Sequence, residues 1–174
     1  MKKKPKAQKF FDYNVYVACS LTHAPVKFRE EIEFFKDKLR SFCNVLCFLG
    51  IDGHPPHKIY DFDINKCVKK SDLVVAICDL PSIGLGMEMG TQVEARRMPC
   101  LALAHEKSHV TCFVLDTRQP GYDFRRYRDL KKDAIERVIE KLEKMSKDKI
   151  KKGFNLEATE LSLRRNTKKK LVTG

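Results

Sequence analysis

Short runs of apolar and β-branched residues alternate along this chain with longer amphipathic segments, and this alternation constrains the fold more than any other feature. Five runs are expected to be strands, namely Tyr13–Cys19, Val45–Leu49, Leu73–Cys78, Cys100–Ala104 and Cys112–Leu115. The other segments have apolar residues at helical spacing and are expected to be helices, namely Lys27–Phe42, Ile59–Lys70, Met87–Arg97 and Asp129–Met145. Strands that are apolar throughout and alternate with helices predict a parallel sheet with helices on both faces.

The number of strands favours one arrangement of this α/β class. Five parallel strands suggest a flavodoxin-like (Rossmann-like) sheet with the order 2-1-3-4-5. Ligands of such sheets bind beyond the carboxyl ends of the strands, near the point where the strand order reverses. That point lies at the loops Ser20–Pro25 and Asp79–Gly86. We therefore expect the functional residues in and around these two loops.

The charge of the chain is concentrated at its two ends. Among 174 residues, 35 Lys and Arg outnumber 23 Asp and Glu, for a net charge of +12. Residues 1–9 contribute +5 and residues 146–174 contribute +6, so residues 10–145 are nearly neutral and are expected to form the catalytic domain. The basic ends could attract nucleic acid, but solubility is the favoured interpretation because aromatic residues that stack on bases are scarce there.

Other classes of protein are disfavoured by the sequence. No apolar run approaches the ~20 residues of a membrane span, and no apolar stretch of a secretory signal follows the basic N-terminus, so we expect a cytoplasmic protein. The seven cysteines are an odd number without a C-x-x-C pair, which is typical of reduced, buried thiols. His54 and His57 flank two prolines without further ligands nearby, so neither a metal nor a cofactor is expected.

The segment after the third expected strand carries the strongest chemical signal. Its glycines would let amide N–H groups approach an anion, and Glu88 is expected in the first helical turn, where the helix dipole keeps a carboxylate ionised. Such a residue is either a helix-start acid or a nucleophile that attacks the anomeric carbon of a sugar. A second acid for this chemistry would be Asp61 or Asp63, because either begins a helix that could reach the same pocket.

Three segments occur in a recognisable order over roughly residues 13–145: Tyr16–Leu21, then Asp63 with Ser71–Ala76, then Pro81–Gly90. Together they resemble the nucleoside 2-deoxyribosyltransferase family, which includes 2'-deoxynucleoside 5'-monophosphate N-hydrolases. The resemblance implies that Glu88 is the nucleophile on C1', that Asp63 is the acid near the base, and that Tyr16 orients the nucleophile. Asp61 remains the alternative to Asp63, because Asp63 is one residue further from Asp72 than the family pattern has it.

The same resemblance suggests which end of a nucleotide is recognised. It implies that Ser20, Ser82 and Gly84 lie along the sugar and phosphate. The transferase branch tends to have an aspartate at the position of Ser82, whereas a serine beside the amides of Gly84 and Gly86 suits a 5'-phosphate. It also implies a homodimer or larger assembly, in which a neighbouring subunit supplies a hydroxyl from Ser108 or Thr111.

These observations predict hydrolysis of the N-glycosidic bond of a nucleoside 5'-monophosphate through a covalent intermediate on Glu88. Two alternatives remain. One is a deoxyribosyltransferase that exchanges bases. The other is a non-catalytic nucleotide-binding module whose basic ends contact nucleic acid.

Overall fold

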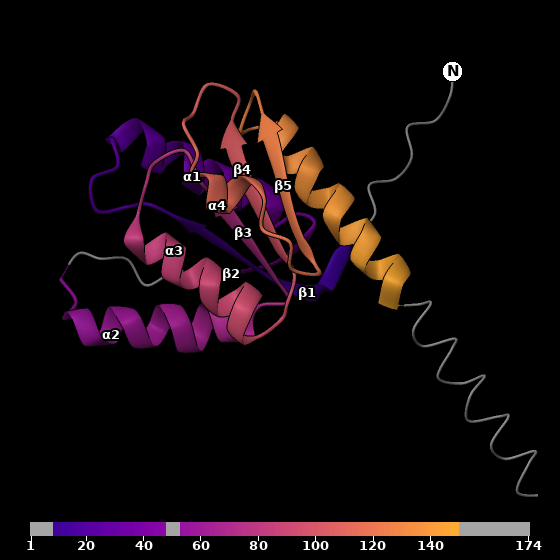
Figure 1. Cartoon of the computed structure of the whole chain (residues 1–174), viewed down its shortest axis with the longest axis horizontal. Coiled ribbons are helices and arrows are strands. Elements are labelled where there is room, and N and C mark those ends of the chain that lie inside the picture. The colour runs from indigo at the N-terminus through magenta and orange to yellow at the C-terminus, as the bar shows by residue number, and fades with distance from the viewer. Residues whose placement is uncertain (1–8, 48–52, 150–174) are drawn as a thin grey trace, which may run out of the picture. The chain divides into compact units, whose positions relative to one another are not determined.

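A five-stranded, all-parallel sheet forms the centre of the protein (Figure 1). The structure, a computed structural model, describes residues 9–47 and 53–149. The strands are β1 (Phe10–Cys19), β2 (Cys43–Leu46), β3 (Leu73–Ile77), β4 (Cys100–His105) and β5 (Tyr122–Tyr127). Their order is β2-β1-β3-β4-β5, and each neighbouring pair is parallel. The predicted α/β fold with flavodoxin-like strand order is therefore confirmed.

Helices cover both faces of the sheet (Figure 1). One face carries α2 (Pro56–Tyr60), which continues through the π-helical η1 (Asp61–Cys67) into η2 (Val68–Lys70), and α3 (Ile83–Gly90), which continues into the π-helical η3 (Thr91–Ala95). The opposite face carries α1 (Val26–Leu39). A short α4 (Cys112–Leu115) precedes β5, and residues 133–149 are helical. The sheet and the labelled helices belong to a compact unit that ends at Ile139.

The alternation of side chains along the central strands divides the core between the two faces. One cluster joins Tyr16, Ala18, Val74 and Ala76 of the sheet to buried residues of η1 and α3. The intervening strand residues point to the other face, where the buried stripe of α1 lies. Tyr16 therefore projects toward η1 and α3, which brings a polar residue of the central strand beside both helices.

The fifth strand was predicted in the wrong place. Cys112–Leu115 is the helix α4, and the fifth strand is Tyr122–Tyr127. The apolar run 112–115 has no buried residue, and Phe113 is 85% exposed, so its hydrophobic character does not come from a place in the sheet. The true strand pairs with β4 alone and contains charged residues, because an edge strand needs apolar side chains on fewer positions.

The other predicted elements are present with shifted ends. The helix expected to start at Met87 begins at Ile83, and the last helix starts at residue 133 rather than Asp129. The second strand begins two residues earlier than expected, while the predicted end at Leu49 lies outside the described residues. Within the described ranges, no helix combines the length and the apolar character that crossing a membrane would require.

Candidate active site

Three side chains from three separate elements meet at the carboxyl end of β1. The phenol of Tyr16 on β1 donates a hydrogen bond to Asp63 Oδ1 on η1 and lies 3.1 Å from Glu88 Oε1 on α3. Tyr16 is 3% exposed and Glu88 is 7% exposed. The residues are 47 and 72 positions apart from Tyr16 in the sequence, so the parallel topology brings them together. Asp61, the alternative acid, instead accepts a hydrogen bond from Asn65 Nδ2 at 2.6 Å and is exposed.

A widened helical turn carries Asp63. In η1 the amide of Val68 donates both to the carbonyl of Asp63, five residues earlier, and to that of Ile64, the usual four residues earlier. Such π-helical turns are rare and occur frequently at functional sites, since they rotate a side chain away from its regular α-helical position. The turn here presents the Asp63 carboxylate to Tyr16 while Ile64 and Cys67 of the same turn stay in the core.

The Glu88 carboxyl group holds a proton at neutral pH. Burial, the charge of Asp63 and hydrogen bonding with Asp63 together raise the pKa of Glu88 to about 9, although the hydrogen bond from Tyr16 acts in the opposite direction. Burial and the charges of Glu88 and Asp63 also raise the pKa of Tyr16 above its ordinary value, so the phenol remains a donor. A buried carboxyl group beside a second carboxyl group resists ionisation, and Glu88 therefore keeps its proton.

The expectation that the helix dipole keeps Glu88 ionised was wrong for two reasons. Because α3 begins at Ile83, Glu88 lies in the second helical turn, beyond the amides that favour a negative charge. Burial beside Asp63 then outweighs the remaining field, since desolvation is the largest influence on this group. Glu88 thus becomes an anion only when its proton moves to Asp63 or to a ligand.

A cavity of about 180 Å³ opens over these three residues. It is lined by Tyr16, Val17, Cys19, Leu21, Thr22, Lys36, Ile59, Asp63, Ser82, Gly84, Leu85 and Glu88. The predicted residues Ser82 and Gly84 therefore share the cavity with the carboxyl pair. Ser20 is buried directly after β1 and is not among the lining residues, so its predicted contact with a substrate gains no support.

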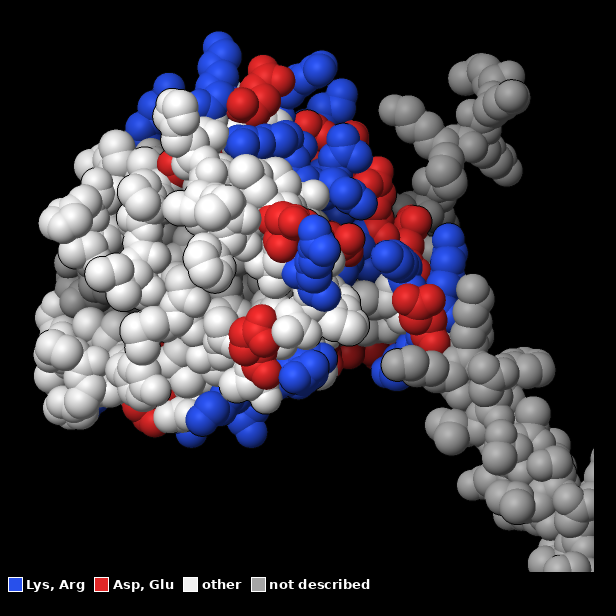
Figure 2. Space-filling model, viewed as in Figure 1, with Lys and Arg blue, Asp and Glu red and all other residues white. Residues whose placement is uncertain are grey.

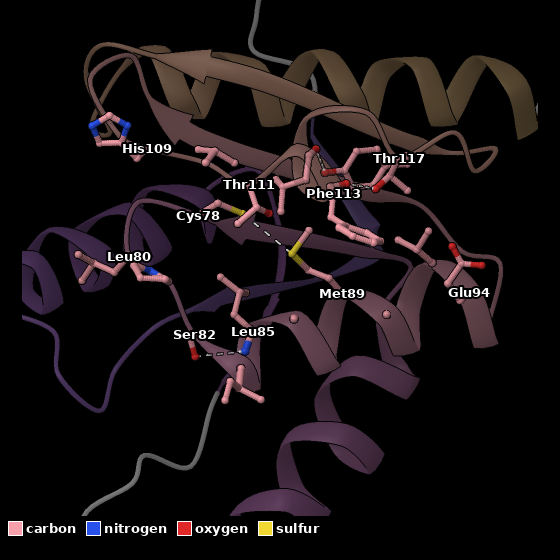
Figure 3. Close-up of a pocket in the computed structure, with 18 residues that line it drawn as sticks. Cys78, Leu80, Ser82, Leu85, Met89, Glu94, His109, Thr111, Phe113 and Thr117 are labelled. Atoms are coloured by element: carbon pink, nitrogen blue, oxygen red, sulfur yellow. Dashed lines mark hydrogen bonds between the residues drawn. The ribbon is translucent and has the colours of Figure 1, made fainter.

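The two predicted glycines have different surroundings. Ser82 caps α3 by accepting the amide of Leu85 at 3.3 Å, and the amide of Gly86 donates to the carbonyl of Ser82 at 3.1 Å (Figure 3). The Gly86 amide thus donates within the helix, so its predicted role as a phosphate donor gains no support. Gly84 lines the cavity, and a Cβ there would contact Ser82 Oγ at 3.7 Å, so the fold itself does not require a glycine.

Their surroundings distinguish Ser108 from Thr111 as candidates for donating a hydroxyl to a ligand. The hydroxyl of Ser108 donates to Asp79 Oδ1 at 2.7 Å, and the other oxygen of Asp79 accepts the phenol of Tyr127. Ser108 therefore holds its own loop at the end of β4. Thr111 precedes α4 and lines a second, larger pocket, which makes it the better of the two candidates for donating a hydroxyl to a ligand.

This second pocket is an apolar groove of about 670 Å³ between α3 and α4 (Figure 3). Ser82 and Leu85 line both the groove and the cavity, so the two adjoin. Among the described residues, Glu94 is the one acidic residue that lines the groove, and Phe113 and Ile83 are more than four-fifths exposed. Figure 2 shows the same face as a broad area with few charged side chains.

Lys36 is a lining residue that the sequence interpretation missed. It is 5% exposed, and its ammonium donates to Glu33 Oε1 at 2.8 Å. Its position is visible in the sequence, because it occurs four residues after Ile32 on the buried stripe of α1, beside Phe35. A lysine on an otherwise apolar stripe was the available signal.

The described residues contain no group of three or more His, Cys, Asp or Glu side chains that could hold a metal ion. Cys19 lines the cavity, where burial raises its pKa to about 12 and keeps it a thiol. The groups available for chemistry in the cavity thus include two carboxyl groups, a phenol, the hydroxyls of Thr22 and Ser82, and an ammonium.

Two solved structures are similar to this chain. The CMP N-glycosidase BcmB from Clostridium botulinum has a TM-score of 0.53 and 18% identity over 72% of this chain and 97% of its own. A 2-desoxiribosyltransferase from Leishmania mexicana has a TM-score of 0.47 and 14% identity over 65% of this chain and 83% of its own. The sequence matches no protein-family model and no curated protein. The first likeness confirms the fold.

Proposed function

We propose that this protein is an enzyme that hydrolyses the N-glycosidic bond of a nucleoside 5'-monophosphate, with Glu88 as the nucleophile. The observation that carries the proposal is the hydrogen-bonded group of Tyr16, Asp63 and Glu88, which lines a cavity. Two adjacent carboxyl groups, of which one holds a proton, supply both a nucleophile and an acid, which are the two groups that glycosidic cleavage requires. The solved structure with the same fold is named as a CMP N-glycosidase, in agreement with this proposal.

In the first step, an oxygen of the Glu88 carboxylate forms a bond to C1' of the sugar while the bond from C1' to the base nitrogen breaks. The electron pair of that bond stays on the base. The proton that has moved from Glu88 to Asp63 then passes to the base. Tyr16 donates its hydrogen bond within the pair and fixes the orientation of both carboxyl groups. The product of this step is a free base and a sugar ester of Glu88.

In the second step, water attacks C1' of the ester. Asp63, now ionised, accepts a proton from the water, the ester bond breaks, and Glu88 leaves as a carboxylate. The reaction releases a sugar 5-phosphate and leaves the two carboxyl groups with one proton, as at the start. If a second base took the place of water, the same intermediate would yield a new nucleotide, and this is the transferase alternative.

The start of α3 is the proposed site of the 5'-phosphate. The amides of the first turn of a helix and the positive end of its dipole favour an anion, and Ser82 contributes a hydroxyl beside them. Gly84 lines the cavity at the same place and leaves room for a ligand. A bound phosphate would hold C1' in position over Glu88, so remote binding energy would assist the reaction.

We further propose that the protein acts in the cytoplasm as a homodimer, in which the apolar groove is covered by a second copy. The groove adjoins the cavity at Ser82 and Leu85, and it lies on a face with few charged side chains (Figure 2). A neighbouring subunit on this face could place its Thr111 close to the proposed phosphate site.

The test is the release of free base from a panel of nucleosides and their 5'-monophosphates. Wild-type protein should release base from monophosphates, and Glu88→Gln should lower the rate by several orders of magnitude. Glu94→Gln is the matched control, because Glu94 lines the groove rather than the cavity and its substitution removes the same charge. Unimpaired base release by Glu88→Gln would refute the mechanism, and no release by the wild type would refute the proposed activity.

A further inference from the structure

Lys36 is a buried cation in the cavity that the proposed mechanism does not use. Its side chain is 6% exposed, whereas that of its ion-pair partner Glu33 is 61% exposed. Among the described residues that line the cavity, Lys36 is the one Lys or Arg. Water weakens the pair from the Glu33 side, but the ammonium itself is held away from solvent, where its field acts strongly on its neighbours.

Removing a lysine from water is unfavourable, so its place requires a reason. A lysine stem can pack on apolar residues while the ammonium extends to the surface, and such a residue would end in solvent. Lys36 does not fit this description, because the residue is only 5% exposed and is among those that line the cavity. An ammonium has three N–H bonds, and in the described part of the chain one donates to Glu33, so two remain for a ligand.

Lys36 occupies the side of the cavity that β1 forms. Burial raises the pKa of Cys19 on β1 and of Cys67 on η1 to about 12, and the charge of Lys36 acts on both in the opposite direction. Lys36 extends from α1, on the opposite face of the sheet from η1 and α3, and lines the cavity together with Val17 and Cys19 of β1. The opposite wall is formed by α3, with Ser82, Gly84 and Glu88.

The two walls correspond to the two ends of a nucleotide. With the phosphate at the start of α3 and C1' over Glu88, the base extends away from α3, toward the side of the cavity that β1 and Lys36 form. In a pyrimidine, a carbonyl oxygen is bonded to the carbon next to the glycosidic nitrogen. When the glycosidic bond breaks, the electron pair left on that nitrogen is shared with this oxygen, which becomes negative.

We propose that Lys36 recognises the base by donating a hydrogen bond to this carbonyl oxygen, and that its charge stabilises the base as it leaves. A fixed cation aimed at a charge that develops in the transition state accelerates a reaction, because it needs no reorganisation. The inference rests on the proposed function and deepens it, since it assigns the class of base: pyrimidines, with a carbonyl next to the glycosidic nitrogen, should be preferred over purines.

The test compares two substrates that differ in their leaving group. One is a pyrimidine nucleoside 5'-monophosphate, whose base needs stabilisation as it departs. The other is the corresponding 4-nitrophenyl glycoside 5-phosphate, whose nitrophenolate leaves readily without it. The variants are Lys36→Met, which keeps the length and removes the charge, Lys36→Arg, which keeps the charge, and Glu33→Gln, which removes the ion-pair partner and keeps the ammonium. Circular dichroism establishes that each variant is folded.

We expect Lys36→Met to lower kcat for the pyrimidine substrate by about 100-fold, as the loss of one donor to a developing negative charge does in other enzymes. The nitrophenyl substrate should change little. Lys36→Arg should recover part of the pyrimidine rate, and Glu33→Gln should behave as the wild type.

Equal losses on both substrates would overturn the inference, because they would indicate that Lys36 only shapes the cavity. Retention of the full pyrimidine rate by Lys36→Met would overturn it as well. A wild type that favours purines over pyrimidines would refute the assignment of the base. If the wild type cleaves neither substrate, the proposed function itself is refuted, and the inference is refuted with it.

Discussion

Replacing Glu88 with glutamine should stabilise the folded protein at neutral pH, and the gain should grow as the pH rises. The pKa of Glu88 is raised from 4.5 to about 9 by burial and by Asp63. The folded protein therefore holds a proton that the unfolded chain releases between these two values. Because its pKa is raised in the folded state, Glu88 contributes its full stabilisation of the folded protein below pH 4.5. This stabilisation is lost as the pH rises toward 9.

The size of the effect follows from the same numbers. Within this window the free energy of unfolding falls by about 1.4 kcal/mol for each pH unit, because folding then takes up one proton. From about pH 5 to about pH 7 the wild type should lose about 3 kcal/mol from this group alone. Glutamine does not titrate, so the difference in stability between the variant and the wild type should increase by that amount.

Urea unfolding of both proteins at a series of pH values measures this difference. The chain has no Trp, so far-ultraviolet circular dichroism is the appropriate signal. Other titrating groups are common to both proteins and cancel. The free energy of unfolding of Glu94→Gln should depend on pH as that of the wild type does, because Glu94 is exposed. If the free energy of unfolding of Glu88→Gln also followed that of the wild type between pH 5 and 8, the conclusion that Glu88 holds a buried proton would be refuted.

Three further results are expected. Gly84→Ala should lower the turnover of monophosphates and leave the fold at least as stable, since alanine is the better helix former. Gly86→Ala should keep the activity, because a Cβ at Gly86 meets nothing within 4 Å and lies outside the cavity. Equal turnover in the two variants would contradict the assignment of Gly84. Ser82→Asp should reduce kcat/KM for a monophosphate more than for its nucleoside, because a carboxylate repels the phosphate; unchanged selectivity would remove the phosphate from this site. Mixing Glu88→Ala with Thr111→Ala subunits should restore part of the activity if a neighbour completes the site, and an active monomer in light scattering would exclude a shared site.

Much of the fold could be predicted because its central strands are buried on both faces. Leu73–Ile77 is apolar at every position and fully buried, so its pattern had one interpretation. The edge of the sheet was different. Tyr122–Tyr127 contains an aspartate and two arginines, and nothing in its composition separates it from a loop, whereas the apolar run 112–115 forms an exposed helix. Pairing with β4, rather than local sequence, determines the fifth strand.

The residues of the site were easier to predict than their chemical state. Tyr16, Asp63 and Glu88 were proposed from the family resemblance, and the structure brings them into contact. Their charges depend on burial and on each other, which no local pattern contains. The start of α3 also could not be read from its glycines, because the Ser82 cap and the packing of Leu85 make a helix of a segment that resembles a loop.

The central claim is that Glu88 carries the sugar during the reaction, and acid quenching during turnover tests it most directly. Intact-mass and peptide mass spectrometry of the quenched protein should show a sugar phosphate attached to the peptide that contains Glu88. The adduct should be absent from Glu88→Gln and should disappear from the wild type once substrate is exhausted. Rapid base release with an adduct on another residue, or with none at any quench time under conditions where the second step is rate-limiting, would contradict the account.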